Sequence, residues 1–348
     1  MSKRSNTVKK ILVTGGCGFI GSNFIRHIID KDYFVCNLDK LTYAGNLDNL
    51  KGIEGRKNYK FIKGDISDAK TVEGIILKFD VDIIVNFAAE SHVDRSILGP
   101  EIFTKTNVLG TQVLLDVSRN CWSRKGYKGK RFVQISTDEV YGSLGKSGKF
   151  KETTSLAPNS PYSASKAAAD LLVNAYRQTF GYPAIISRCS NNYGPYQFPE
   201  KLIPLMIINA ISNRKLPVYG DGLNVRDWLY VEDHCSAIEA MIRKGKLGEV
   251  YNIGGNNECQ NIKVVKLILK ELGKPLSLIS YVADRLGHDR RYAMDAGKIM
   301  RELGWRPKHR FEKGLKDTVR WYLNNKDWWK KIISGEYQQY YRKIYKGR

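Results

Sequence analysis

Short apolar runs alternate with helical patterns along the first half of the chain. Each run has the length of a buried strand, and apolar residues between runs recur at helical spacing, as Phe24, Ile25 and Ile28 do. Strands separated by helices in this way are typical of a parallel sheet covered on both faces. The pattern therefore predicts an α/β fold with a doubly wound parallel sheet, the Rossmann architecture. The predicted strands lie at residues 9–14, 33–38, 59–62, 81–87, 132–135 and 184–188, and the longest predicted helices at 101–122 and 161–180.

The pattern changes after residue 190. From there the chain is rich in Gly, Pro and polar loops, interrupted by shorter helical patterns at 202–212, 231–243 and 262–272. This change predicts a smaller α/β lobe on the C-terminal side that holds the substrate. We expect a Rossmann domain with the catalytic residues at 1–190, mainly the binding lobe at 191–322 with some chain crossing back, and a basic aromatic tail at 323–348.

The first predicted strand runs directly into a glycine-rich loop. Glycines at positions 15, 18 and 21 permit a tight turn, close backbone approach to a pyrophosphate and close helix–strand packing. The flanking strand and helix make this stronger than an isolated glycine pattern. The second strand ends at Asp39, where a carboxylate accepts hydrogen bonds from a ribose 2′-hydroxyl and repels a 2′-phosphate. The sequence therefore predicts NAD rather than NADP, unless Asp39 is only a turn residue.

Two more strand ends carry candidate cofactor contacts. Asp65 follows the third strand and is either a contact to the adenine edge or the N-cap of the helix predicted at 68–79. Ala88 and Ala89 follow the fourth strand, and small residues at a strand end let the backbone approach a cofactor closely.

Candidate chemistry lies at the end of the fifth strand and in the helix that follows it. Ligands of open α/β sheets bind beyond the carboxyl ends of the strands, so we expect reacting groups at 136–139. Pro161 suits a helix start, which places Tyr162 and Lys166 four apart on one helical face. A Lys ammonium beside the phenol lowers the Tyr pKa, so Tyr162 is a candidate general base. Taken alone, the pair could equally be an amphipathic surface feature.

Charge and composition add little to this picture. The chain has 348 residues, 42% of them apolar, and a net charge of +22. The basic residues are scattered rather than interleaved with aromatics, which favours a solvated surface over a nucleic-acid platform. The most basic and aromatic part follows Arg306 and includes Trp328, Trp329, Tyr340, Tyr341 and Tyr345, for which we expect a packed C-terminal helix.

Neither cysteines nor histidines form a metal-site pattern. The six cysteines show no Cys-x-x-Cys pairing, and the five histidines are dispersed. This argues against a metal site and a disulfide framework and for a reducing compartment. The apolar stretch at 11–13 is too short for a signal peptide or a membrane span. We expect a cytoplasmic protein without nucleic-acid or membrane partners.

Three motifs carry a resemblance to the extended short-chain dehydrogenase/reductases: Gly-Gly-x-Gly-Phe-Ile-Gly at 15–21, Ala-Ala-Glu-Ser-His at 88–92 and Tyr-x-x-x-Lys at 162–166. Within that superfamily, Thr137-Asp138-Glu139 resembles the signature of the dTDP-glucose 4,6-dehydratases. The similarity covers roughly residues 9–321, and Cys17 is the one departure at a motif position, where the family usually has Ala. Further matching segments lie at 39–46, 191–196, 199–204 and 287–292.

The resemblance implies a hydro-lyase whose NAD is regenerated in each cycle. Tyr162, as phenolate, takes the proton of the sugar 4-hydroxyl while carbon 4 passes hydride to NAD. Glu139 then removes the carbon 5 proton, protonated Asp138 donates to the departing 6-hydroxyl, and hydride returns to carbon 6 of the 4-keto-6-deoxy sugar nucleotide. Thr137 bonds the 4-hydroxyl and Lys166 the nicotinamide ribose. Neighbouring strand residues point opposite ways, so the backbone must turn at 138–139 to aim both carboxylates at the sugar.

The resemblance also implies two sets of binding residues. Those expected to contact NAD are Gly15, Gly18, Phe19, Ile20, Gly21, Asp39, Lys40, Thr42, Asp65, Ile66, Ala88, Ala89, Ser91, Thr106, Tyr162, Lys166 and Asn191. Those expected to contact the sugar nucleotide are Ser91, His92, Thr137, Asn191, Lys201, Leu202, Pro217, Tyr219, Arg226, Asn261, Arg285, His288, Arg291 and Tyr292. The family forms homodimers through a four-helix bundle of the helices near 101–122 and 161–180.

Several alternatives remain at this point. UDP-glucose differs from dTDP-glucose by a methyl group and a ribose hydroxyl, and no motif reports on either. A sugar-nucleotide 4-epimerase shares Tyr162 and Lys166 but needs no acid–base pair such as Asp138 and Glu139. Decarboxylating relatives typically carry Ser at the position of Asp138. A non-enzymatic NAD-sensing or nucleic-acid-binding protein is suggested only by the charge. The product would serve deoxysugar biosynthesis, such as that of rhamnose.

Overall fold

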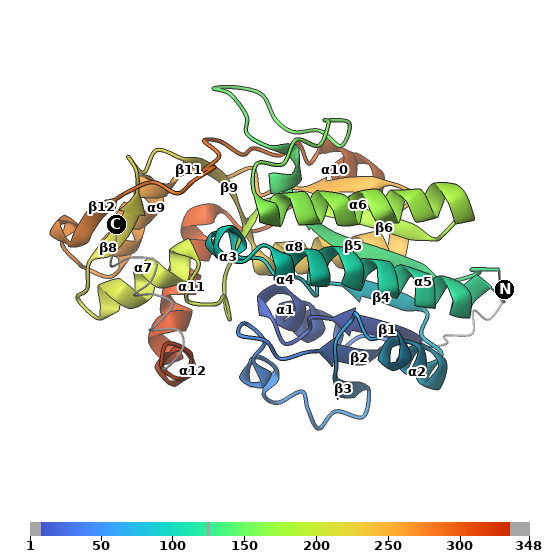
Figure 1. Ribbon diagram of the computed structural model, residues 1–348. Coiled ribbons are helices and arrows are strands. Elements are labelled where there is room, and N and C mark those ends of the chain that lie inside the picture. The colour runs from blue at the N-terminus through green and yellow to red at the C-terminus, as the bar shows by residue number, and fades with distance from the viewer. Residues whose placement is uncertain (1–7, 124–125, 335–348) are drawn as a thin grey trace.

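A computed structural model describes residues 8–123 and 126–334, and its centre is a seven-stranded sheet in which every neighbouring pair is parallel (Figure 1). The strand order is β10-β6-β5-β4-β1-β2-β3. The order reverses between β1 and β4, and a doubly wound sheet binds its ligand at such a switch point. The strands of this sheet are β1 (Lys9–Thr14), β2 (Tyr33–Asp39), β3 (Tyr59–Lys63), β4 (Ile83–Asn86), β5 (Arg131–Thr137), β6 (Ala184–Cys189) and β10 (Val250–Ile253).

Helices cover both faces of the sheet, which is why its strands are apolar on both sides. In β1, Ile11 and Val13 face one core cluster and Leu12 faces the other. The first cluster lies under α1 (Phe19–Ile28), α8 (Val231–Lys244) and α10 (Gly297–Leu303). The second lies under α2 (Ala69–Phe79), α5 (Gly110–Ser123) and α6 (Pro161–Phe180). The predicted α/β fold with a doubly wound parallel sheet is confirmed.

The helix predicted over 101–122 is not regular. It consists of α4 (Glu101–Phe103), a π-helical segment η2 (Thr104–Leu109) and α5, and it is preceded by α3 (Val93–Leu98), which was not predicted. Single π-turns inside α-helices are frequent at functional sites. The π segment carries Thr106, which lines the cleft described below.

The second lobe has its own core and its own small sheets. Three strands pair in the order β11-β9-β7, and β12 pairs with β8. The strands are β7 (Asn191–Tyr193), β8 (Leu216–Tyr219), β9 (Val225–Tyr230), β11 (Glu258–Gln260) and β12 (Ile279–Val282). The helices of the lobe are α7 (Leu202–Ile211), α9 (Asn261–Glu271), α11 (Phe311–Asn324) and α12 (Lys326–Ile332), and it contains the 3₁₀ turn η4 (Leu276–Leu278). Two other 3₁₀ turns, η1 (Leu47–Leu50) and η3 (Asp138–Tyr141), belong to the sheet domain.

The chain crosses between the two units more than once. From β9 it returns to the Rossmann sheet with α8 and β10, goes back to the lobe with β11 and α9, and returns again with α10. The sheet domain therefore contains residues from the C-terminal half, such as Tyr251 and Trp305.

The C-terminal helices are packed as far as the structure describes them. Trp328 and Trp329 of α12 are buried against the lobe core, in agreement with the predicted packed helix. Tyr340, Tyr341 and Tyr345 of the predicted tail lie outside the described residues, as do positions 1–7. Within 8–123 and 126–334, no helix combines the length and apolar character that a membrane crossing requires.

Candidate functional site

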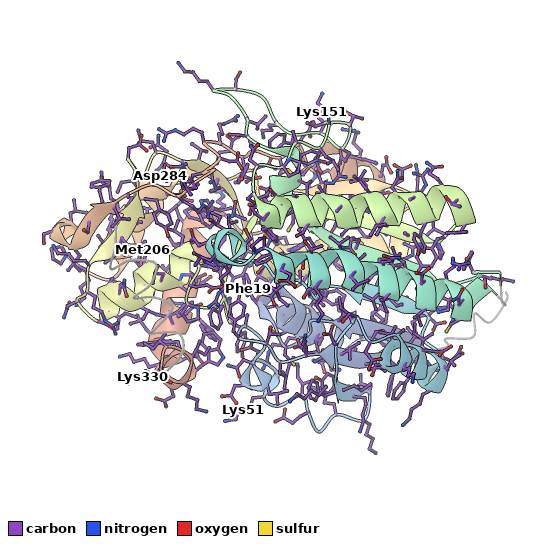
Figure 2. The ribbon with its side chains drawn as sticks, viewed as in Figure 1. Phe19, Lys51, Lys151, Met206, Asp284 and Lys330 are labelled. Carbon is purple, nitrogen blue, oxygen red and sulfur yellow. The ribbon has the colours of Figure 1, made fainter. Side chains whose placement is uncertain are left out.

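A cleft with a volume of about 290 Å³ runs along the carboxyl ends of the central strands, between the sheet and the lobe. Phe19, which begins α1 and lines this cleft, is labelled in Figure 2 where the two units meet. Loops after β1, β2, β3 and β4 form one side, and residues 135–139, Tyr162 and the 189–201 segment form the other. The cleft lies at the switch point of the sheet, where a doubly wound fold binds its ligand.

The glycine loop forms a cradle that side chains would fill. Gly15 has φ +67°, and a Cβ there would lie 2.7 Å from the backbone nitrogen of Ala88. A Cβ on Gly21 would collide with the Gly15 carbonyl, whereas one on Gly18 would meet only that carbonyl, at 3.3 Å. No side chain caps the N-terminus of α1, and its first turn holds no acidic residue. The helix end is therefore suited to an anion such as a pyrophosphate.

Asp39 is fixed at the end of β2 by the loops around it. Its two carboxylate oxygens accept the backbone N–H groups of Cys17 and Leu41, each at 2.8 Å. Burial raises the pKa of Asp39, although these two hydrogen bonds oppose the rise. Each carboxylate oxygen still has a lone pair for a ribose hydroxyl. Asp39 lines the cleft and also holds the turn after β2 through the Leu41 N–H, so its contact with a ribose stays a prediction.

Asp65 is not a helix cap. The N-cap of α2 is Asp68, whose side chain accepts the backbone N–H groups of Lys70 and Thr71. Asp65 instead lines the cleft and pairs with the Lys40 ammonium at 2.6 Å. Burial alone would raise the pKa of Asp65, but the Lys40 contact brings it below its ordinary value. Of the two predicted alternatives for Asp65, the helix cap is excluded.

Tyr162 and Lys166 lie inside the molecule. The helix start is set by a capping box in which the Ser160 hydroxyl accepts the Ser163 N–H at 3.1 Å, with Pro161 in the first turn. Tyr162 is 8% exposed and Lys166 is 4% exposed, which excludes the surface pair that was the alternative. The Lys166 ammonium donates to the carbonyl oxygen of Ile135 in β5, at 2.6 Å.

The effect predicted for the pKa of Tyr162 is wrong for the chain by itself. Burial raises this pKa well above its ordinary value, and the charge of Glu139 raises it further, while a hydrogen bond with Thr137 opposes the rise. Lys166 does not counter these effects, because its ammonium is held on the Ile135 carbonyl and burial lowers its own pKa. The rise in the Tyr162 pKa caused by desolvation and nearby carboxylates is therefore larger than the lowering expected from Lys166.

The two adjacent carboxylates are carried by a turn that begins where β5 ends. Thr137 caps the 3₁₀ turn η3: its Oγ1 accepts the Glu139 N–H at 3.3 Å and donates to Asp138 Oδ1 at 3.1 Å. In a 3₁₀ helix successive residues are about 120° apart rather than on opposite faces. The predicted backbone turn is therefore present, and Asp138 and Glu139 both line the cleft.

The environments of the two carboxylates differ. Burial raises the pKa of Asp138 well above its ordinary value, and the charge of Glu139 raises it further. Burial also raises the pKa of Glu139, but the cations Arg285, Lys201 and Arg226 oppose that rise. Asp138 is therefore the carboxylate that holds a proton more readily, and Glu139 is the one whose negative charge the surrounding cations stabilise.

The predicted cofactor residues all line this one cleft, together with Thr137, Asp138, Glu139 and Lys201. Most other predicted substrate residues come from the lobe, where the charges of Arg226 and Arg285 lower the pKa of Glu139. The Arg226 guanidinium lies 4.3 Å from the centre of the Tyr292 ring and donates to the Asp289 carbonyl at 2.9 Å. His288 contacts Asp284 at 2.6 Å and stands edge-on to Tyr219. Burial and neighbouring cations lower the pKa of His92 and of His288.

Ten of the predicted substrate residues are not among those that line the cleft: His92, Leu202, Pro217, Tyr219, Arg226, Asn261, Arg285, His288, Arg291 and Tyr292. Arg291 pairs with Glu258 at 2.6 Å and donates to the Gly148 carbonyl at 3.0 Å, so its side chain is held by outer loops. The sequence could not distinguish Arg291 from Arg285, because only the lobe fold decides which arginine turns inward. Three more of these residues are held elsewhere in the lobe: Leu202 packs against the lobe core, Pro217 is buried in β8, and Asn261 begins α9.

Two clusters near the cleft were not predicted from sequence. Glu200 accepts the Tyr43 hydroxyl and the Arg95 Nε, both at 3.0 Å, and joins the loop after β2 to the lobe. The sequence offered one indication of this cluster: Tyr43 and Glu200 lie in the matching segments 39–46 and 199–204, in which other residues were predicted to bind NAD or the sugar nucleotide.

The second cluster consists of buried side chains around Tyr141, the last residue of the η3 turn that carries Asp138 and Glu139. Arg188 donates from Nε to Asp170 and from Nη1 to the Tyr141 hydroxyl, both at 2.9 Å. The Tyr141 hydroxyl donates to Asn252 at 2.8 Å. Asp170 belongs to the helix of Tyr162, and Tyr141 ends the turn of Asp138, so the cluster joins these two segments.

Comparisons with known proteins agree with this geometry. The family model described as GDP-mannose 4,6 dehydratase matches residues 12–318. A dTDP-glucose 4,6-dehydratase of Xanthomonas campestris is 54% identical over 94% of this chain and 97% of its own length. The crystal structure of dTDP-glucose 4,6-dehydratase from Bacillus anthracis in complex with NAD is 54% identical, with a TM-score of 0.86 over 93% of this chain and 99% of that one. The Streptomyces venezuelae enzyme, solved with NAD and dTDP, is 49% identical with a TM-score of 0.88 over the same shares.

Proposed function

The chain belongs to the dTDP-glucose 4,6-dehydratase family, and from that membership we propose that it converts dTDP-glucose to the 4-keto-6-deoxyglucose nucleotide and water. One observation carries the reaction type: Asp138 and Glu139, two adjacent carboxylates in different electrostatic environments, line the same cleft as Tyr162. An epimerase exchanges hydride at carbon 4 alone and has no use for an acid–base pair. The carboxylate pair therefore favours elimination of water.

The cofactor of this reaction is NAD, and the residues of the cleft fit it. The open face at Gly18 and the uncapped start of α1 suit the pyrophosphate, and Asp39 suits the adenosine ribose. When bound, NAD accepts a hydride from carbon 4 of the sugar and gives it back at carbon 6, so that it is unchanged overall. Lys166 lies beside Tyr162 to hold the hydroxyls of the nicotinamide ribose.

Tyr162 takes the proton of the sugar 4-hydroxyl, and Thr137 bonds the same oxygen. Because burial and Glu139 raise the pKa of Tyr162 in the chain alone, the phenolate must be stabilised by positive charge at the nicotinamide end of the cleft. The Lys166 ammonium supplies part of this charge when it turns from the Ile135 carbonyl towards the ribose. The base is thereby activated only in the loaded enzyme.

The carboxylates then act as a pair. The ketone at carbon 4 acidifies the proton on carbon 5, and Glu139 removes that proton as a carboxylate. Asp138, which holds its proton because it is buried next to Glu139, donates it to the departing 6-hydroxyl. A base and an acid are thus available at the same time at neutral pH.

The lobe supplies the cations for the diphosphate. Lys201 lines the cleft, and Lys201, Arg226 and Arg285 all lower the pKa of Glu139 by their charge, so we assign these three cations to the sugar end of the site. Cationic side chains of this kind clamp the phosphates of a nucleotide. We accordingly assign the sheet domain to NAD and catalysis and the lobe to the sugar nucleotide.

We further propose a homodimer that packs through a four-helix bundle. Figure 1 shows α5 and α6 as two long helices side by side on one face of the sheet. Large apolar side chains on the helical segments of this face are exposed, with exposed fractions of 41% to 59%. They are Leu98, Ile102, Leu109, Leu171 and Phe180. For the location we propose the cytoplasm, in keeping with six cysteines that are all free.

The test is incubation of the purified protein with dTDP-glucose and, separately, with UDP-glucose, without added reductant. We expect loss of water from dTDP-glucose by mass spectrometry and much slower conversion of UDP-glucose. Preference for UDP-glucose would keep the mechanism and change the base. Formation of a galactose nucleotide without loss of water would favour the epimerase, and no turnover of either would return attention to a non-enzymatic role.

A further inference from the structure

The two neighbouring tryptophans of α12 are both buried, yet their indole N–H groups bond to different parts of the molecule. Trp329 donates to the carbonyl of Tyr322 in α11, at 2.9 Å, within the lobe. Trp328 donates to Oδ1 of Asn49 in η1, at 2.8 Å, across to the sheet domain. The helix lies beyond residues 12–318, which match the family model, and has no part in the chemistry above.

Asn49 connects Trp328 to the glycine loop. Its side chain is 2% exposed, and its Nδ2 donates to the carbonyl of Cys17 at 2.8 Å. The same carbonyl accepts the backbone N–H of Asn46 at 3.0 Å, and the Cys17 N–H donates to Asp39. An indole N–H only donates and a carbonyl only accepts, so one orientation of the Asn49 amide satisfies both partners. Trp328, Asn49 and Cys17 therefore form a continuous hydrogen-bonded link.

A second route joins the same helix to α1, whose N-terminus faces the pyrophosphate position. Arg26 of α1 donates to the carbonyls of Asn49, at 2.9 Å, and of Lys51, at 3.0 Å. Its guanidinium lies 4.9 Å from the centre of the Tyr196 ring, which packs edge-on against Trp328. The glycine loop and α1, which form the predicted pyrophosphate site, are therefore both connected to α12 by these contacts.

The remaining contact between α12 and η1 contributes little. Lys331 pairs with Asp48 at 3.0 Å, but the two side chains are 71% and 44% exposed. Exposed pairs of this kind are weak because water screens them. The buried link through Trp328 is accordingly the contact that can transmit a change in α12 to the glycine loop.

We propose that α12 is a brace for the cofactor site, in which Trp328 acts through Asn49 to hold the Cys17 carbonyl and so the NAD-binding shape of the glycine loop. Trp328 and Asn49 are positioning residues, since neither lines the cleft. The inference rests on the proposed use of NAD. It gives the C-terminal helix a role in cofactor retention, because the loop can open only if this link breaks or moves with it.

The test compares the two tryptophans in the full-length holoenzyme. Trp328→Phe keeps an aromatic ring and loses the donor to Asn49, whereas Trp329→Phe loses a donor that stays within the lobe. The readout is the rate at which bound NAD exchanges with isotopically labelled NAD, followed by mass spectrometry. We expect Trp328→Phe and Asn49→Ala to accelerate exchange about five- to tenfold, as for loss of one buried hydrogen bond. The double variant should exchange no faster than the faster single variant.

Other readouts separate the brace from a general loss of stability. The two Trp→Phe variants should lower the melting temperature to a similar extent, and the dissociation constant for dTDP should stay unchanged in both. Equal NAD exchange rates in Trp328→Phe, Trp329→Phe and the unaltered protein would overturn the brace alone. An unaltered protein that neither carries nor takes up NAD would overturn the proposed cofactor and the brace with it.

Discussion

The cofactor side of the cleft is built from segments at the ends of neighbouring strands, whereas the substrate side depends on charged side chains from distant segments. On the first side, Gly15, Gly18 and Asp39 follow directly from the ends of two neighbouring strands. On the second, Lys201 precedes α7, Arg226 lies in β9, and Arg285 lies in a loop after β12. The cofactor side therefore depends on local chain geometry, and the substrate side depends on how the lobe folds.

The two sides also differ in how charge is handled. Backbone N–H groups hold the Asp39 carboxylate, so its position is independent of any other ionised side chain. Burial raises the pKa of Glu139 instead, and three cations of the lobe oppose that rise. Changes on the cofactor side should therefore alter NAD retention, and changes on the substrate side should alter rate, substrate affinity and pH dependence.

The largest effect is expected from Glu139→Gln. The amide cannot take the carbon 5 proton, so product formation should fall about 10²–10⁴-fold while oxidation at carbon 4 remains. The check is rapid-mixing absorbance of the reduced cofactor, which should accumulate in this variant. Undiminished product formation would mean that another base serves carbon 5 and that the substrate side has been assigned wrongly.

Next in size is Gly15→Ala, which probes the cofactor side. A left-handed φ costs a residue with a Cβ about 1–2 kcal/mol, and this Cβ would also press on the backbone of Ala88, at 2.7 Å. We expect purified protein with little bound NAD. Gly52→Ala is the matched control, since Gly52 has φ +85° and no atom within 4 Å of its Cβ position. If both variants retained NAD equally, the close approach at Gly15 would have no role.

A smaller effect is expected from Arg285→Met. Removing this cation should raise the pKa of Glu139 further, because Arg285 is the first of the charges that oppose burial there. Glu139 must be ionised to act, so the acidic limb of the pH–rate profile should move to higher pH. The KM for the sugar nucleotide should rise about tenfold on loss of a charged contact, with NAD content unchanged.

Arg285→Lys provides the control for charge. It keeps a cation near Glu139 and should restore most of the original pH profile. A profile that shifts equally in Arg285→Met and Arg285→Lys would show that geometry rather than charge sets the behaviour of Glu139.

The smallest effect is expected from Cys17→Ala. Cys17 contributes its backbone N–H and carbonyl to the loop, and burial raises the pKa of its thiol to about 12, so the side chain stays neutral. Only a weak contact from Asn37 to the sulfur, at 3.4 Å, is lost. NAD exchange should change by no more than about twofold. A large change would mean that the thiol itself, and not the backbone, shapes the cofactor side.

What the sequence predicted follows the same division. The glycine loop, Asp39 and the carboxylate turn after β5 were recognisable because each depends on residues close together in the chain. The inward turn of Arg285 and the outward turn of Arg291 were not, since both lie in one short motif and the lobe fold alone separates them. The structure was therefore needed to tell which of these two arginines acts on Glu139.

Two further features could not be read from local pattern. The pKa of Tyr162 depends on burial and on Glu139, which outweigh the lysine four residues away. The contact from Trp328 to Asn49 joins positions 279 residues apart, so only the packing of α12 reveals it. In both cases the decisive partner is absent from the local sequence.

The most direct test of the account uses dTDP-glucose that carries deuterium at carbon 4. The account predicts a product that has lost one water, retains the deuterium on carbon 6 and has taken the hydrogen on carbon 5 from solvent. That result requires oxidation at carbon 4, elimination of water with Glu139 as the base and Asp138 as the acid, and return of the same hydride within one active site. A nucleotide sugar that keeps its water, with deuterium still at carbon 4, would contradict it.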